Sequence, residues 1–236
     1  MMILGIFKIS KYHRPMIKSI CLGIICFISL QLSAQGEFYP PKVEISDYTL
    51  SKFLTELTLA VGKKDKDFIL EHLDPHILNS FGGDGGIEEF KMYWKFNDDS
   101  TNFWEVVENI LLIGGPSFDG SSDKNSYYLP FTFTNWPEQY DAFEHYLVYG
   151  TNVNVRDQPS TTNSEVLGQL SYQIVQITNP EGEMLSENND WLHITTVDNK
   201  LSGYVYRKFL ISPIGYRMGF TKTENGWKIN MLVAGD

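Results

Sequence analysis

The chain has 236 residues, of which 42% are hydrophobic, 14% aromatic and 20% charged. This composition is ordinary for a folded protein and excludes a disordered chain, because so much aromatic surface is not stable in water. Acidic residues outnumber basic ones 29 to 19, and the formal net charge is −10. We expect no nucleic-acid partner, since binding to DNA or RNA depends on clustered lysines and arginines that neutralise phosphates.

An apolar run without any charge extends over residues 20–32. Basic residues precede the run, and the small residues Ser33 and Ala34 follow it. This order is typical of a secretory signal peptide, and the run is shorter than the ~20 residues that a membrane span needs. We therefore expect residues 1–35 to be a signal peptide, cleaved after Ala34 or Gln35.

Cleavage would determine both the compartment and the cysteine content of the mature chain. We expect an exported protein in the periplasm or the extracellular space, with no membrane span after processing. Cys21 and Cys26 lie inside the apolar run, so the mature chain would hold no disulfide, thiol nucleophile or cysteine-bound metal. The start of translation stays open between Met1 and Met16.

Helical spacing of apolar residues begins after Pro41 and predicts two helices in succession. The first helix has Ser46 as its N-cap and ends at Gly62. The second has Asp65 as its N-cap and ends near Pro75, because proline cannot continue a helix.

Two more helices are predicted after a glycine-rich loop at residues 82–86. Glu88 and Glu89 fall in the first turn of the third helix, where acidic side chains interact favourably with the helix dipole. The fourth helix carries apolar side chains from Phe103 onwards and ends at Gly114. This part of the mature chain is therefore predicted to be a helical unit.

The helical unit is predicted to carry a small antiparallel sheet. Residues 127–133 form an aromatic run in which Pro130 indicates an edge strand or a bulge. An Asn-Gly pair at residues 225–226 lies between two alternating runs, which is a strong hairpin signal. A lone hairpin is barely stable in water, so we expect it to complete this sheet. The predicted α+β domain combines residues 40–143 with residues 212–236.

From about Tyr146 the helical spacing gives way to short alternating runs, which indicate a small barrel. Four blocks in this region resemble a bacterial SH3 (SH3b) domain: Asn152–Ser160, Val166–Leu170, Trp191–Ile194, and Gly203–Tyr206 with Phe209-Leu210. Gly203 falls where a small barrel bends sharply and a side chain would obstruct. The resemblance implies a five-stranded SH3-like β-barrel over residues 146–211. The complete fold is then of the α+β class, with a helical unit and its sheet beside this barrel.

The SH3b resemblance also implies a binding module that recognises a peptide or the peptide stem of the cell wall. SH3-type surfaces bind extended peptides in aromatic grooves. The candidate binding residues are three tyrosines and two polar residues that could hydrogen-bond to a ligand or hold a carboxylate: Tyr149, Tyr204, Tyr206, Asn154 and Arg156. Simple strand packing accounts for the tyrosines equally well.

Alternation along the last of these runs assigns different positions to its residues. Side chains at positions i and i+2 share one face of a strand. Val205 is therefore predicted to lie in the core, and Tyr204 and Tyr206 are predicted to face outward.

No catalytic or metal-binding set stands out, so we expect no cofactor, no metal and no enzymatic activity. His72 and His76 are four residues apart, but Pro75 disturbs the helical register and no third ligand is evident. The loop at residues 82–86 lacks the lysine and hydroxyl residues of a phosphate-binding loop. We interpret it as a turn in which Asp84 caps nearby amides.

Two alternatives remain open. The segment from Leu57 to Leu73 and the closing residues 225–229 resemble the ends of NTF2-like domains, which implies an enzyme with an acid or a histidine in an aromatic pocket. Five aromatic residues would line that pocket or simply form a core: Phe103, Trp104, Phe131, Phe133 and Trp136. In the second alternative, the SH3b domain packs only against its own chain and has a structural role.

Overall fold

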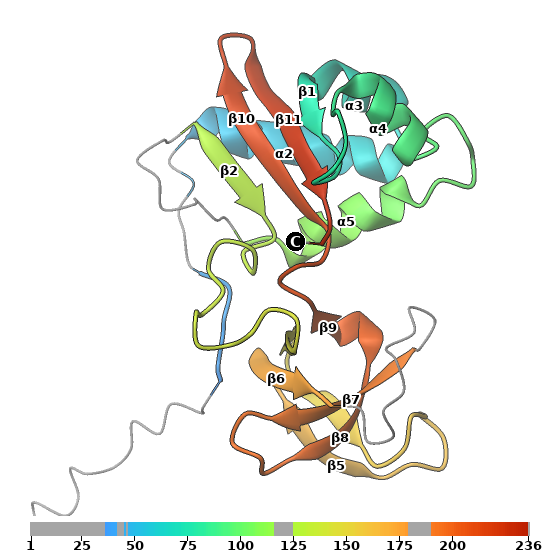
Figure 1. The fold of residues 1–236 in the computed structure, drawn as a ribbon, viewed down its shortest axis with the longest axis vertical. Coiled ribbons are helices and arrows are strands. Elements are labelled where there is room, and N and C mark those ends of the chain that lie inside the picture. Colours follow the sequence, from blue (N-terminus) through green and yellow to red (C-terminus); the bar gives the residue numbers. More distant parts are fainter. Residues whose placement is uncertain (1–35, 42–44, 46, 116–124, 179–189, 236) are drawn as a thin grey trace, which may run out of the picture. The chain divides into compact units, whose positions relative to one another are not determined.

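The structure is a computed structural model, and it describes all residues except 1–35, 42–44, 46, 116–124, 179–189 and 236. The predicted signal peptide and the predicted N-cap Ser46 therefore lie outside the described residues. Within the described part of the chain, four α-helices and two β-sheets make a mixed α+β structure (Figure 1). The α+β class that the sequence predicted is confirmed.

The described helices lie close to where the spacing of apolar residues predicted them: α2 (Tyr48–Lys63), α3 (Lys66–His72), α4 (Ile87–Tyr93) and α5 (Phe103–Ile113). Asp65 caps α3 as predicted, since its carboxylate accepts a hydrogen bond from the Phe68 amide at 3.0 Å. The N-cap of α2 differs from the prediction. It is Asp47, whose carboxylate accepts a hydrogen bond from the Thr49 amide at 2.8 Å.

The end of α2 also differs from the prediction, because the helix continues through Gly62. Lys64 instead takes the left-handed conformation that ends the helix, with φ of 54°. Its amide donates to the Val61 carbonyl at 3.0 Å, and the next amide, of Asp65, donates to the Ala60 carbonyl at 2.9 Å. These bonds satisfy the last carbonyls of the helix, so a lysine is tolerated where glycine is usual.

The helices accompany a four-stranded sheet with the order β1-β11-β10-β2. Its strands are β1 (Leu73–Leu78), β2 (Ser126–Leu129), β10 (Arg217–Thr223) and β11 (Gly226–Val233). The C-terminal hairpin provides β10 and β11, the two central strands, so it completes this sheet as expected. The expectation of a purely antiparallel sheet is wrong, because β1 runs parallel to β11.

Of the two edge strands, β2 overlaps the aromatic run in which Pro130 indicated an edge or a bulge, whereas β1 carries no clear strand signal in the sequence. The buried residues of β1, Leu73 and Ile77, are four positions apart, with Pro75 between them. Proline is tolerated in β1 because one side of an edge strand needs no partner. At the other edge, β2 ends at Leu129 rather than at residue 133, since Pro130 has no N–H to donate to the sheet.

One hydrophobic core joins the helices to the four-stranded sheet. Every helix and strand of this part contributes a buried side chain to it, for example Leu57, Ile69, Ile77, Phe90, Phe103, Tyr127, Phe220 and Trp227. Burial of a large apolar side chain contributes about 1.5–3 kcal/mol, so this core dominates the stability of the helical part.

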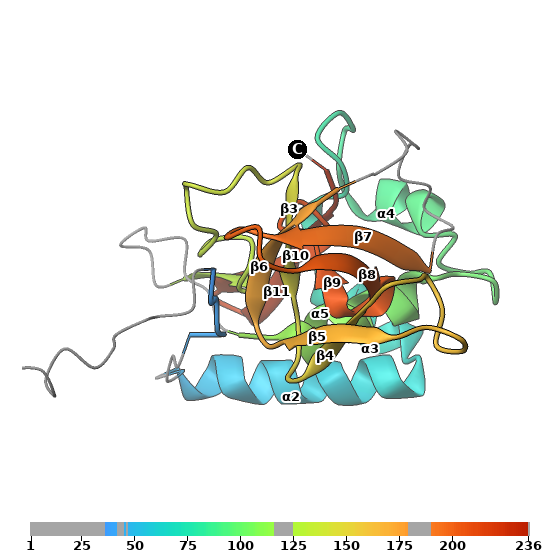
Figure 2. The same ribbon diagram turned by 90° about the horizontal axis from the view of Figure 1, so that it is seen from below.

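The second sheet has seven strands in the order β5-β4-β8-β7-β6-β3-β9 (Figure 2). They are β3 (His145–Val148), β4 (Val153–Arg156), β5 (Val166–Leu170), β6 (Gln173–Ile177), β7 (Trp191–Thr196), β8 (Ser202–Tyr206) and β9 (Leu210–Ile211), with the 3₁₀ helix η1 (Arg207–Phe209) before β9. The sequence predicted an SH3-like barrel of five strands. The described strands instead form one sheet of seven, with β5 at one edge and β9 at the other. The two additional strands carry weak signals, since burial does not alternate along β3 and β9 has two residues.

Alternation along the strands gives this sheet a core cluster of its own. Val155, Ile194 and Val205 belong to it and are fully buried. The predicted core position of Val205 is therefore confirmed, and its neighbours Tyr204 and Tyr206 are only half-buried.

Contacts group residues 36–236 into one compact unit, so the division into an α+β domain and an inserted SH3b domain stays a prediction. Among the described residues, we find no helix with the length and apolar character that a bilayer crossing requires.

Truncation after Ser212 should unfold the helical part and its sheet. The change removes both central strands together with Phe220 and Trp227, whereas the seven-stranded sheet contains no residue of this segment. The point variant Phe220→Ala should also destabilise the helical part and lower its free energy of unfolding by about 3–5 kcal/mol. Differential scanning calorimetry measures both effects. Loss of only the transition of the seven-stranded sheet would refute this account.

Asp47 connects α2 to the C-terminal hairpin. Its Oδ2 lies 2.7 Å from Nζ of Lys222, and the neighbouring Thr49 Oγ1 accepts a hydrogen bond from Nε1 of Trp227 at 3.0 Å. The hydrogen bond from Lys222, followed by those from Thr49, lowers the pKa of Asp47 below its ordinary value. The ionised carboxylate is therefore favoured in the folded state.

Asp47→Asn should remove this ion pair and keep the helix cap. Because the folded-state pKa is depressed, the stabilisation is complete above the unfolded pKa of about 3.9 and is lost as pH falls below it. The free energy of unfolding should differ between wild type and variant by ~1 kcal/mol at about pH 6, since the pair is partly exposed. Urea denaturation should show this difference shrinking by about pH 2. A difference that is constant over this range would rule out the ion pair as its source.

Candidate functional site

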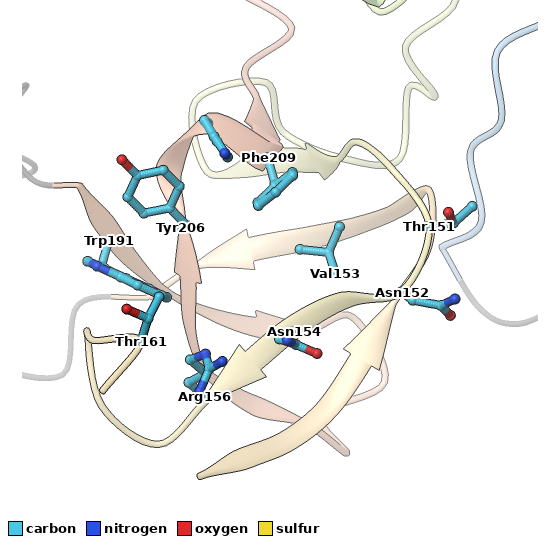
Figure 3. A pocket seen from close by; sticks show the side chains of 10 residues that line it. Thr151, Asn152, Val153, Asn154, Arg156, Thr161, Trp191, Tyr206 and Phe209 are labelled. Atoms are coloured by element: carbon cyan, nitrogen blue, oxygen red, sulfur yellow. The ribbon is translucent and has the colours of Figure 1, made fainter. Parts of the chain in front are cut away.

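A groove with a volume of about 430 Å³ opens on the seven-stranded sheet (Figure 3). It is formed by β4 and the residues before it, the loop after β4, the start of β7, and the segment from the end of β8 into η1. The residues that line it are Thr151, Asn152, Val153, Asn154, Arg156, Thr161, Trp191, Tyr206, Lys208 and Phe209. Figure 3 shows Trp191 and Thr161 toward one end of the groove and Thr151 and Asn152 toward the other.

Aromatic rings form one side of the groove. Trp191 on β7 and Tyr206 on β8 are directly paired across the strands, and their ring centroids are 5.3 Å apart. The ammonium of Lys208 lies 5.4 Å from the centroid of the Tyr206 ring and 5.0 Å from that of Phe209. These cation–π contacts hold the lysine against both rings at the edge of the groove.

Polar side chains of β4 form the opposite side. Nη1 of Arg156 donates to the side-chain oxygen of Ser164 at 3.0 Å and to its carbonyl at 3.4 Å. No described residue accepts a hydrogen bond from Nε or Nη2 of this arginine. Oδ1 of Asn154 accepts a hydrogen bond from Gln169 at 2.9 Å. Both side chains are thus oriented by neighbours and keep further hydrogen-bonding groups for a ligand.

Three of the five candidate residues from the sequence line this groove, namely Asn154, Arg156 and Tyr206. Tyr149 and Tyr204 are not among the lining residues. The structure therefore brings the two polar candidates together with one of the three tyrosines.

Tyr149 makes contacts within the chain. Its hydroxyl donates to the carbonyls of Leu112 and Ile113, at 3.1 and 3.2 Å, at the end of α5. Burial, with a smaller contribution from Tyr172, raises the pKa of Tyr149 above its ordinary value. The hydroxyl therefore remains protonated and serves as a hydrogen-bond donor.

Tyr204 shares the outer face of β8 with Tyr206 but packs against a different partner. It is paired with His193 on β7, with ring centroids 4.9 Å apart. The His193 ring forms a 2.8 Å hydrogen bond with Oγ1 of Thr178, and burial lowers the pKa of the histidine. This neighbourhood makes Tyr204 a useful control for Tyr206.

Seven groove residues were not among the candidates from the sequence: Thr151, Asn152, Val153, Thr161, Trp191, Lys208 and Phe209. Trp191 and Phe209 belong to the blocks that resemble an SH3b domain, so the resemblance could have nominated them. Lys208 lies in the 3₁₀ helix η1, which follows β8, and Thr161 lies in the loop after β4. The position of neither residue follows from the helix or strand period of apolar residues in the sequence.

The glycine-rich loop at residues 82–86 presents its amides to a carboxylate of its own chain. The amides of Asp84 and Gly85 donate to Oε2 of Glu89 at 2.9 and 3.2 Å, and Asn79 donates to Oε1 at 3.1 Å. Gly85 has φ of 74°, which fits the predicted turn. The expectation that Asp84 caps this loop is wrong, because Glu89, in the first turn of α4, points back and takes that role.

The two histidines considered as metal ligands do not share a helix face. His72 is the last residue of α3 and stacks on Phe68 with ring centroids 4.0 Å apart, whereas His76 lies on β1. In the part of the chain that the structure describes, no group of three or more His, Cys, Asp or Glu side chains is arranged to hold a metal.

The aromatic residues considered for an enzyme pocket divide into separate groups. Phe103 and Trp104 belong to the core of the helical part. Phe131 and Trp136 contact the ring of Phe38, with centroids 5.2 and 5.6 Å apart.

Phe133 packs on Arg217, whose guanidinium carbon lies 4.6 Å from the ring centroid. The buried polar or charged side chains among the described residues are Asn79, Thr132, Thr196 and Arg217. None of these is an acid or a histidine.

Comparison of the chain with models of known protein families, with curated proteins and with solved structures gives no match. The SH3b and NTF2-like resemblances therefore rest on the sequence blocks alone.

Val205→Ala and Tyr206→Ala should affect stability very differently. Val205 is fully buried, so its truncation leaves a cavity and should lower the free energy of unfolding by about 1–3 kcal/mol. Tyr206 is half-buried at the groove, and its truncation should cost less than about 1 kcal/mol. Urea denaturation measures both variants. Equal destabilisation would mean that Tyr206 is a packing residue and not part of an accessible surface.

Proposed function

We propose that the protein is an exported, non-enzymatic binding protein whose SH3b-type module, residues 146–211, recognises an extended peptide of the cell wall. The groove carries this proposal, because it combines an aromatic side formed by Trp191, Tyr206 and Phe209 with a polar side formed by β4. Extended peptides bind in aromatic-lined grooves of this kind. Most of the lining residues also belong to the sequence blocks that resemble an SH3b domain.

Each side of the groove has a distinct task in this proposal. The rings supply a rigid apolar surface, and these side chains lose little conformational freedom when a ligand packs on them. Asn154 and Arg156 supply hydrogen bonds that fix the direction of the peptide, and an arginine fork suits a carboxylate. Such a site binds and releases its ligand without covalent chemistry.

The same proposal places the protein in the periplasm or the extracellular space. The apolar run at residues 20–32, with basic residues before it and small residues after it, supports export. A cell-wall ligand is present in that compartment, so the predicted location and the predicted ligand are consistent with each other.

A structural role within the chain is the second candidate, and the contacts of Tyr149 favour it. The hydroxyl of Tyr149 donates to two carbonyls at the end of α5, so this tyrosine serves packing. The described residues that line the groove, in contrast, all belong to the seven-stranded sheet and its loops. The proposed binding residues are therefore those of the groove, Asn154, Arg156, Trp191, Tyr206 and Phe209, and they include neither Tyr149 nor Tyr204.

Tyr206→Ala should weaken binding of the mature chain to purified cell-wall sacculi by roughly tenfold or more, as expected for an aromatic anchor. Trp191→Ala should have the same effect. Tyr204→Ala is the matched control, since it removes the same side chain from the same face of β8 but outside the groove. Sedimentation of protein with sacculi measures the affinities. No binding by the wild type, or equal losses for Tyr204→Ala and Tyr206→Ala, would overturn the proposed function.

A further inference from the structure

The groove has a charge opposite to that of the whole protein. Arg156 and Lys208 line it, and among the described residues no acid is part of the lining. The chain as a whole has a formal net charge of −10, so the charge of the groove is opposite in sign to that of the protein. A positive site on an acidic protein selects its ligand by charge.

Neither cation is neutralised by the groups that hold it in place. The hydrogen-bond partners of Arg156 are the side-chain oxygen and the carbonyl of Ser164, both uncharged. Lys208 lies over the rings of Tyr206 and Phe209. Among the described residues, no ion pair includes either cation.

The acids nearest in sequence lie outside the lining. Asp157 follows Arg156, but Oδ1 of its carboxylate accepts the amide of Glu165 at 2.7 Å and thereby closes the loop after β4. Asp190 precedes Trp191 and is exposed to solvent. Neither acid lines the groove, so Arg156 and Lys208 are the charged side chains among the described lining residues.

From this charge pattern, and resting on the proposed function, we infer that the ligand is an acidic stem peptide of the cell wall. Its free carboxylates bind beside Arg156 and Lys208, and its aliphatic part packs on Trp191 and Tyr206. Arginine and lysine both form charge-assisted hydrogen bonds to carboxylates, which are stronger than hydrogen bonds between neutral groups. A basic peptide would be repelled by Arg156 and Lys208. A neutral peptide would remove water from these two cations without offering them a negative charge in exchange, which costs free energy.

The test uses sacculi whose free carboxylates have been converted to amides with a carbodiimide and ammonium chloride. The mature wild-type chain should bind these amidated sacculi at least about tenfold more weakly than untreated sacculi. Binding to untreated sacculi should also weaken as sodium chloride is raised, because the contact is partly electrostatic.

Charge-removing variants identify the residues responsible. Lys208→Gln and Arg156→Gln should each weaken binding to untreated sacculi by about threefold to tenfold, and each should weaken binding to amidated sacculi by a smaller factor. Lys200→Gln is the matched control, because it removes an equal charge from an exposed lysine that does not line the groove. Arg156→Lys keeps the charge and should recover part of the affinity that Arg156→Gln loses. Melting curves confirm that each variant is folded, and Lys208 is exposed, so its replacement leaves the fold intact.

The outcomes separate this inference from the proposed function. Equal binding to untreated and amidated sacculi, with Trp191→Ala still deleterious, would overturn the acidic ligand and leave the groove as a peptide site. Equal losses for Lys200→Gln and Lys208→Gln would also overturn it, since the effect would then come from net charge. No binding of the wild type to either preparation would overturn the proposed function itself.

Discussion

The position of the groove depends on how closely β4 approaches β8 at Gly203. A Cβ atom at this residue would lie 2.5 Å from the carbonyl oxygen of Arg156, a distance that no side chain tolerates. Glycine therefore allows the two strands to meet, and the resulting register pairs Arg156 with Tyr204. The next pair of strands brings Trp191 opposite Tyr206. A single close approach of two backbones thus sets the separation between the cationic and the aromatic sides of the site.

Features that depend on neighbours in sequence could be predicted from the sequence. Asp65 caps its helix, the Asn-Gly pair at residues 225–226 forms the hairpin, and Val205 is buried between two outward tyrosines. Each follows from the preferences of a few adjacent residues or from the two-residue period of a strand. Gly203 was expected at a sharp bend of a barrel, whereas the structure gives a different reason for glycine there, the close approach of the Arg156 carbonyl.

The pairing of the C-terminal hairpin with the distant helical unit was predicted, because a lone hairpin needs a partner, but other features that depend on distant segments were not. β1 carries two buried residues four positions apart and a proline, so only its neighbour β11 makes it a strand. Tyr149, Tyr204 and Tyr206 are equivalent by composition, yet strand register and the end of α5 give them different partners. Lys208 enters the site through contacts with two rings rather than through any pattern in the sequence.

The central place of β10 and β11 has a consequence for the order in which the protein folds. Nζ of Lys228 donates to the carbonyl of Glu71 across 157 positions of sequence, and the whole seven-stranded sheet lies in between. At about 5–20 residues per second, a ribosome needs roughly 10–30 seconds to pass from the first of these residues to the second. During that time the helices have no sheet to cover and their apolar faces remain available to chaperones. The strands of the seven-stranded sheet form one continuous stretch that is synthesised before β10 and β11. This sheet is therefore free to fold before the helical part has its two central strands.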